Sequence, residues 1–125
     1  MAKKLATVFG VVFTLVGLLG ILGIGLGIVG PGGVFATDTV HDLVHLVSGL
    51  VFLAVAFWAS AKSKAALVIF GVVYTLVAIL GFLGNNPVLG FINVNDADNY
   101  LHLLLGVVIL IAGFSSKKDM GGAMM

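Results

Sequence analysis

Four long apolar stretches, each free of lysine, constrain the fold of this chain most strongly. They cover residues 5–29, 40–59, 65–84 and 97–114. A helix needs about 20 mostly apolar residues to cross the roughly 30 Å hydrocarbon core of a bilayer. The sequence therefore predicts an all-α bundle of four transmembrane helices.

The composition excludes other classes of protein. Of the 125 residues, 61% are hydrophobic and 9% are charged, whereas soluble domains carry about 25% charged residues and disordered chains are polar. The chain has no cysteine, which excludes disulfides and thiolate metal sites. A net charge of +1 supplies no basic surface for nucleic acid. The expected partners are the lipid bilayer and either other membrane subunits or a second copy of the chain.

The lysines predict the orientation of the four spans. Alternate connections carry all the lysines, and cytoplasmic segments are enriched in basic residues; the six are Lys3, Lys4, Lys62, Lys64, Lys117 and Lys118. We therefore expect one multi-pass domain over residues 1–125 in a bacterial-type cytoplasmic (inner) membrane. Both termini would be cytoplasmic, with residues 116–125 as a short tail. A cleaved secretory signal is the alternative for the first stretch, but its apolar run exceeds the 7–15 residues of such signals.

An internal repeat relates the two halves of the chain. Residues 9–23 recur at 70–84 with 11 of 15 positions identical. His45 and Gly49 recur as His102 and Gly106. The repeating unit is thus a helical hairpin, at about 5–60 and again at about 65–115. Two spans per unit give parallel repeats, which are related by an axis along the membrane normal, so we expect pseudo-two-fold symmetry.

Polar side chains cluster at the predicted outer starts of the second and fourth helices. Positions four apart lie on nearly the same helix face, and the repeat places the two faces opposite each other. We expect four candidate metal ligands to converge in a pocket that is open, or nearly open, to the outside: His41, His45, Asp98 and His102. Around them we expect a polar stripe of Asp38, Asp42, Asn95 and Asn99.

Three interpretations of this cluster remain open. In the first, the side chains pair with one another and cap the helix starts, a purely structural role. In the second, the imidazoles and the carboxylate bind a divalent metal such as zinc. In the third, His45 and His102 are the axial ligands of a haem, with Gly49 and Gly106 leaving room for the ring.

Several glycines have spacings typical of helix–helix contacts, where small residues let two backbones approach closely. The set comprises Gly10, Gly23, Gly27, Gly49, Gly71 and Gly106.

The histidine-bearing helix starts also carry a resemblance. The segments are Val-His-Asp-Leu-Val-His-Leu-Val-Ser-Gly at 40–49 and Asn-Asp-Ala-Asp-Asn-Tyr-Leu-His-Leu-Leu-Leu-Gly at 95–106. They resemble an uncharacterised bacterial family of four-helix integral membrane proteins, a domain of unknown function. The resemblance extends over nearly the whole chain and implies four spans in a bacterial-type membrane. It implies no established activity.

These observations favour a non-enzymatic function. We expect a binding module or an accessory subunit of a membrane complex, with the His/Asp cluster at its extracytoplasmic face. The alternative is a redox or transport protein that uses His45 and His102 with a metal or haem. No ionisable side chain lies in the predicted inner half of any span, which argues against ion conduction through one bundle.

Overall fold

The computed structural model describes residues 1–116. It contains four helices of 20 residues each: α1 (Ala2–Ile21), α2 (Thr39–Trp58), α3 (Ser63–Phe82) and α4 (Asp96–Ser115). At 1.5 Å per residue each helix is about 30 Å long, and all four are long and apolar enough to cross a membrane. The all-α prediction is confirmed. Residues 117–125, which include Lys117 and Lys118 and all of the expected tail except Ser116, lie outside the described residues.

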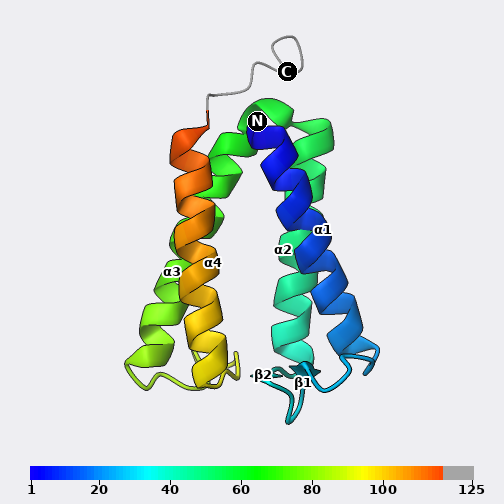
Figure 1. The fold of residues 1–125 in the computed structure, drawn as a ribbon, viewed down its shortest axis with the longest axis vertical. Helices are drawn as coiled ribbons and strands as arrows, with labels where there is room; N and C mark the ends of the chain where they lie inside the picture. Colours follow the sequence, from blue (N-terminus) through cyan, green and yellow to red (C-terminus); the bar gives the residue numbers. More distant parts are fainter. Residues whose placement is uncertain (117–125) are drawn as a thin grey trace.

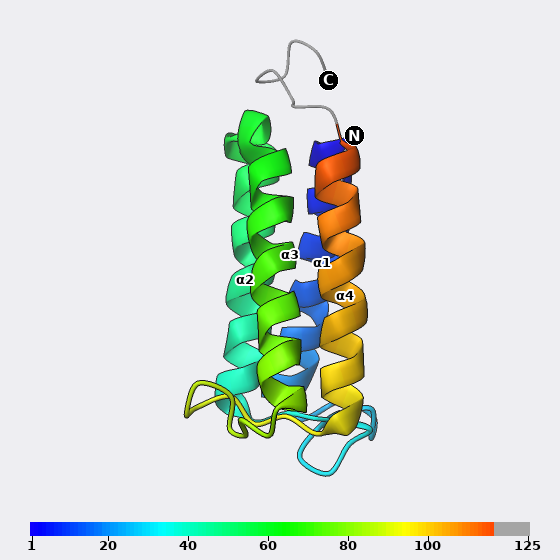
Figure 2. The ribbon, with the colours of Figure 1, turned by 90° about the vertical axis from the view of Figure 1, so that its left-hand side faces the viewer.

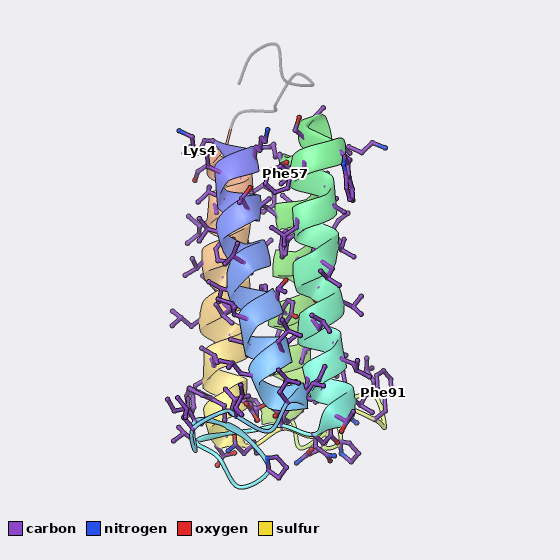
Figure 3. The ribbon with its side chains drawn as sticks, turned by 90° about the vertical axis from the view of Figure 1, so that its right-hand side faces the viewer. Lys4, Phe57 and Phe91 are labelled. Atoms are coloured by element: carbon purple, nitrogen blue, oxygen red, sulfur yellow. The ribbon has the colours of Figure 1, made fainter. Side chains whose placement is uncertain are left out.

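The helices are arranged as two hairpins. α1 packs along α2 and α3 packs along α4, while the hairpins meet mainly through α1 with α3 and α2 with α3 (Figures 1 and 2). A 3-10 turn, Ser60–Lys62, joins α2 to α3 at the end where α1 begins and α4 finishes. The longer loops 22–38 and 83–95 lie together at the opposite end. We call these the lysine end and the loop end; Lys4 and Phe57 mark the first and Phe91 the second (Figure 3).

Glycines bring the two helices of each hairpin into close contact. A Cβ atom added to Gly49 would lie 2.4 Å from the backbone nitrogen of Thr14 on α1. In the second hairpin, a Cβ on Gly106 would lie 2.6 Å from the backbone nitrogen of Thr75 on α3. Gly10 and Gly71 make similar approaches, to Leu53 and Leu110. At Gly49, Gly71 and Gly106 no larger side chain fits without a shift of the neighbouring helix, whereas at Gly10 the Leu53 side chain would have to move.

The first helix is shorter than the apolar stretch that predicts it. α1 ends at Ile21 rather than at residue 29, because the glycine-rich segment that follows takes a left-handed backbone, with φ of 70° at Gly23 and 77° at Gly27. A Cβ atom on either glycine would meet nothing within 4 Å. The prediction that these two glycines pack helices together is therefore wrong. They turn the chain into loop 22–38, where β1 (Val29–Gly30) pairs in parallel with β2 (Phe35–Ala36).

Aromatic rings fill the space between the hairpins. Phe52 of α2 lies 4.4 Å from Phe70 of α3, and Phe13 of α1 lies 5.0 Å from Tyr74 of α3, measured between ring centroids. All four rings are buried or half-buried, and Phe52 is fully enclosed. The outward faces of the helices instead carry exposed Val, Leu and Ile side chains, as expected for surfaces that face lipid. Two of these rings, Phe13 and Tyr74, also contact histidine rings nearer the loop end.

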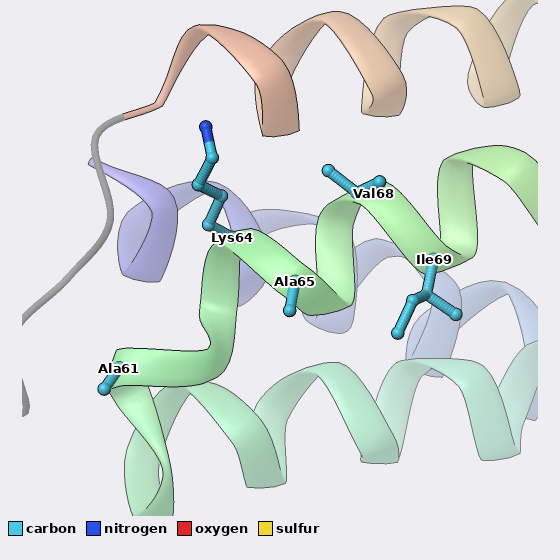
Figure 4. Close-up of a pocket in the computed structure, with 5 residues that line it drawn as sticks. All are labelled: Ala61, Lys64, Ala65, Val68 and Ile69. Atoms are coloured by element: carbon cyan, nitrogen blue, oxygen red, sulfur yellow. The ribbon is translucent and has the colours of Figure 1, made fainter.

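At the lysine end, Lys64 links α3 to α4. Its ammonium donates to the carbonyl oxygens of Gly113, at 2.8 Å, and Phe114, at 3.2 Å. Cations stabilise helix C-termini, whose last carbonyls have no partner within the helix. A hollow beside Lys64 is otherwise lined by the apolar side chains of Ala61, Ala65, Val68 and Ile69 (Figure 4).

Candidate metal centre

Three histidines from two helices meet near the loop end of the bundle. His41 and His45 are one turn apart on α2, and His102 comes from α4. Their ring centroids are 4.6 Å apart for His41–His45, 5.4 Å for His41–His102 and 5.9 Å for His45–His102. One nitrogen atom from each ring lies within 4.8 Å of the others. We call this group the His triad.

The caps of the two helices set the height of the triad. The Asp38 carboxylate caps α2 by accepting from the backbone N–H of His41 at 2.9 Å. The Asn95 side chain caps α4 by accepting from the backbone N–H of Asp98 at 2.8 Å. With both starts fixed, His45 and His102 each lie seven residues beyond their cap, about 10 Å along the axis. The two rings therefore reach the same depth from opposite hairpins.

The imidazole nitrogens are buried and mostly unpartnered. The exposed fraction is 1% for His41, 6% for His45 and 2% for His102. Within residues 1–116, no hydrogen-bond partner reaches Nε2 of His41, Nδ1 of His45 or either nitrogen of His102. Buried polar atoms in folded proteins are nearly always paired. Four unpaired nitrogens in one place make the triad a candidate ligand site.

One nitrogen of the triad does have a partner, and it fixes the tautomer of its ring. Nδ1 of His41 lies 2.7 Å from the carbonyl oxygen of Asn93 in loop 83–95. Because a carbonyl oxygen only accepts, Nδ1 carries the proton and donates it. Nε2 of His41 is then left with a free lone pair. Metal-binding histidines commonly donate their second N–H to a carbonyl or carboxylate in this way.

Asp98, the fourth expected ligand, is engaged elsewhere. Its Oδ2 accepts from the backbone N–H of Asn95 at 2.9 Å, so that Asn95 and Asp98 form a reciprocal capping box. It is buried and interacts electrostatically with His41, but it is not among the residues whose ligand atoms converge. The structure thus brings together three of the four expected ligands. The spacing Asn95-x-x-Asp98 is itself a capping-box signal in the sequence.

The four residues of the expected polar stripe do not share one face. Two of them cap the helix starts, and two point towards the partner helix of their hairpin. Asp38 and Asn95 are the caps described above. Asp42 and Asn99 point away from the triad towards the partner helix within each hairpin. A Cβ atom on Gly20 would lie 2.2 Å from Oδ1 of Asp42, and the Asn99 side chain packs against Gly81 in the same way. Successive helical positions differ by about 100° around the axis, which separates Asp42 from His41.

The cap of α2 also ties the two loops together. Nδ2 of Asn93 donates to Oδ2 of Asp38, and Nδ2 of Asn95 donates to the carbonyl of Val34 at 3.0 Å. The hydrogen bond from the backbone N–H of His41, assisted by that from Asn93, holds the pKa of Asp38 below its usual value. Asp38 is therefore ionised at neutral pH and holds loop 83–95 over the triad.

A cavity of about 210 Å³ adjoins the triad. Its polar wall consists of the three imidazoles together with Ser48 and Tyr74, whose hydroxyl donates to Oγ of Ser48 at 3.0 Å. The remaining wall is apolar, and part of it comes from Leu89, Phe91 and Ile92 of loop 83–95. Residues of this loop thus cover part of the cavity at the loop end; that the pocket is open, or nearly open, to the outside stays a prediction.

A comparison with known families places the chain. Residues 3–115 match the family described as a domain of unknown function, DUF4383. The chain belongs to this family. No curated protein and no solved structure compared with the chain matches it. The family assignment agrees with the resemblance found in the sequence and, like it, assigns no activity.

In this DUF4383 chain the haem interpretation loses its structural support. The glycines that it requires, Gly49 and Gly106, face Thr14 and Thr75 within their own hairpins, so they leave no slot for a planar ring. The adjoining cavity of about 210 Å³ is also below the roughly 300–1,000 Å³ of common cofactor and ligand pockets. The three convergent imidazoles instead suit a single ion.

Sequence reasoning missed three residues of the site. Asn93 contributes through its backbone carbonyl, which no side-chain pattern reveals. Ser48 lies one position from the glycine on which the repeat was recognised, and Tyr74 replaces the phenylalanine of the first repeat. That Phe-to-Tyr difference at positions 13 and 74 was the available signal, because a buried phenol hydroxyl needs a hydrogen-bond partner.

Proposed function

We propose that this protein is a multi-pass membrane protein that binds one divalent transition-metal ion, such as Zn²⁺, at the His triad. It acts as a non-enzymatic binding module or as the metal-binding subunit of a membrane complex. The observation that carries this proposal is the set of buried, unpartnered nitrogens that face one another across the two hairpins. A purely structural cluster would be expected to satisfy its own hydrogen bonds.

The donor set favours a particular group of metals. Neutral imidazole suits Zn²⁺, Cu²⁺, Ni²⁺ and iron, whereas Mg²⁺ and Ca²⁺ prefer oxygen ligands. Three histidines with a fourth position left to a small ligand form a recurrent zinc site. The Asn93 carbonyl supports this choice, since it engages Nδ1 of His41 and leaves the buried Nε2 as the unpartnered nitrogen of that ring.

The proposal includes an orientation and a duplicated architecture. Lys3, Lys4, Lys62 and Lys64 belong to the lysine end, which we assign to the cytoplasm by the positive-inside rule. The triad then lies towards the extracytoplasmic side of a bacterial-type inner membrane. The matching contacts of Gly49 with Thr14 and Gly106 with Thr75 support two parallel repeats about an axis normal to the membrane.

Equilibrium Zn²⁺ binding to the purified protein tests the proposal. We expect one ion per chain, and an affinity at least 100-fold weaker in His45→Ala and in His102→Ala. Asn99→Ala is the matched control, because Asn99 is a buried polar residue of α4 that points away from the triad; it should bind Zn²⁺ like the wild type. Absence of saturable binding, or equal affinity in the histidine variants, would leave the structural interpretation.

A further inference from the structure

Apolar side chains of loop 83–95 form a plug at the loop end of the bundle, beside the cavity of the His triad. Val88, Ile92 and Val94 of loop 83–95 are 0%, 6% and 5% exposed. They pack against Val44 of α2 and against Val77 and Leu80 of α3. The hydrogen bonds of Asn93 with Asp38 and of Asn95 with Val34 fasten this loop to loop 22–38. A molecule arriving from water at the loop end would have to displace the plug.

The exposed part of the cavity wall comes from α3 and from loop 83–95. The lining residues with the largest exposed fractions are Val73 at 46%, Leu89 at 61% and Phe91 at 51%. Val73 is nine residues from the end of α3, about 14 Å deeper along the helix axis. Phe91 lies beside α2 at the flank of the bundle (Figure 3). The exposed rim is therefore apolar, and Val73 places one edge of it within the candidate membrane span of α3.

We propose that the triad cavity takes its ligand from the membrane, through the side opening between α2 and α3. The ligand class is a small, uncharged, mainly apolar molecule with one nitrogen or oxygen donor atom. This inference deepens the proposed function and rests on it, because the donor would occupy the coordination position that the three imidazoles leave open. The resident ion would thus be a receptor for a membrane-dissolved compound.

The chemistry of the wall defines this ligand. Val44, Val73 and Val77 offer apolar contact to its body, whereas the triad, Ser48 and Tyr74 offer polar contact at the inner end. At roughly 30 Å³ per water molecule, a cavity of about 210 Å³ holds the volume of about seven waters. A lipid with two chains does not fit inside it, but a single small ring or short chain does. A charged molecule would lose its hydration at the apolar rim.

Two probes of similar donor strength test the route. The protein is placed in lipid nanodiscs and loaded with Co²⁺, whose visible spectrum reports its ligands. We expect 4-phenylimidazole, which dissolves in the bilayer, to change the spectrum saturably. An imidazole carrying a sulfonate group, which stays in water, should bind at least tenfold more weakly.

Substitution at the rim separates the side opening from other routes. Val73→Phe should weaken 4-phenylimidazole binding at least tenfold while leaving Co²⁺ affinity unchanged, because Val73 lines the opening but does not touch the ion. Val12→Phe is the matched control. Val12 is the repeat equivalent of Val73, is also 46% exposed and lies outside the cavity. Equal binding of the two probes, or equal effects of the two substitutions, would overturn the inference.

A metal-free measurement keeps this test separate from that of metal binding. A 4-phenylimidazole derivative bearing a diazirine is photolysed with the metal-free protein in nanodiscs, and the labelled residues are mapped by mass spectrometry. Labelling around Val73 and Leu89 that disappears in Val73→Phe supports the side opening, even if Co²⁺ fails to bind. Labelling that spreads evenly over the exposed faces of all four helices contradicts it.

Discussion

The two hairpins pack alike but differ in their polar side chains. Thr14 against Gly49 in the first hairpin has its counterpart in Thr75 against Gly106 in the second. Yet His41 of the first hairpin corresponds in sequence to Asp98 of the second. The first hairpin thus supplies two imidazoles to the triad, and the second supplies one imidazole and a capping box.

This difference shows which constraints act on each set of positions. Close contacts between the helices of a hairpin depend on the absence of a side chain, so both hairpins have glycine at the matching positions. The polar positions face two different environments, since loop 83–95 places the Asn93 carbonyl on His41 and side chains of α2 and α3 line the cavity beside the triad. The site is therefore asymmetric although the contacts within the two hairpins match.

The largest expected effect is on Zn²⁺ affinity, when the corresponding residues His41 and Asp98 are each substituted. His41→Ala removes a ligand and should weaken Zn²⁺ binding at least 100-fold, equivalent to about 2.7 kcal/mol. Asp98→Asn keeps an acceptor for the helix cap and removes no ligand, so its affinity should change less than tenfold. Isothermal titration of both variants checks this prediction. A loss in Asp98→Asn as large as that in His41→Ala would place the carboxylate in the site.

Substituting the packing glycine should lower the free energy of unfolding equally in the two hairpins. Gly49→Ala and Gly106→Ala each place a methyl group against a threonine backbone, and such overpacking costs about 1–3 kcal/mol. Equilibrium unfolding in detergent measures both free energies of unfolding. Values that agree within about 0.5 kcal/mol are expected for independent, equivalent sites. A variant that is fully tolerated in one hairpin alone would contradict equivalent packing.

The fold and the site were predictable to different extents. Hydropathy and the repeat predicted α2, α3 and α4 to within about two residues, because these helices extend over nearly the whole of their apolar stretches. The same criterion extended α1 to residue 29, since it counts Ile24 and Ile28 as apolar but takes no account of the left-handed turns at Gly23 and Gly27.

Helical spacing also identified all three histidines of the triad. It could not separate Asp98, which shares their face but bonds back to its own helix start. Nor could it place loop 83–95, which has no periodicity and is positioned by tertiary contacts such as the burial of Val88.

The buried pair Asp42 and Asn99 provides a second contrast. Oδ1 of each has no hydrogen-bond partner among the described residues, and each side chain is at most 4% exposed. Asn99→Asp introduces a carboxylate at such a site and should destabilise the protein by about 2 kcal/mol. Asp42→Asn replaces an acidic side chain by a neutral one and should stabilise it by about 1 kcal/mol. Thermal unfolding of the two variants in the same detergent should shift in opposite directions; shifts of the same sign would contradict this account.

The two caps should give the smallest effects and differ in pH dependence. Asp38→Ala and Asn95→Ala each remove an N-cap acceptor, which costs about 1 kcal/mol. The pKa of Asp38 is lowered in the folded protein from its ordinary 3.8, so its contribution is complete above that value and is lost as pH falls through the folded-state pKa. The amide of Asn95 has no such titration.

Unfolding measured at pH 7 and pH 3 compares each cap variant with the wild type. The deficit of Asp38→Ala should shrink at the lower pH. An Asp38→Ala deficit that is unchanged at pH 3 would mean that the charge of Asp38 does not contribute.

X-ray absorption at the zinc edge tests the His triad most directly. On the Zn²⁺-loaded wild-type protein, we predict three imidazole ligands with Zn–N distances of about 2.0–2.1 Å, together with one further light-atom ligand. In Asp98→Asn the spectrum should be unchanged, and in His102→Ala the imidazole count should fall. A first shell composed only of oxygen atoms, or one that is identical in His102→Ala, would contradict the assignment of the triad as the metal centre.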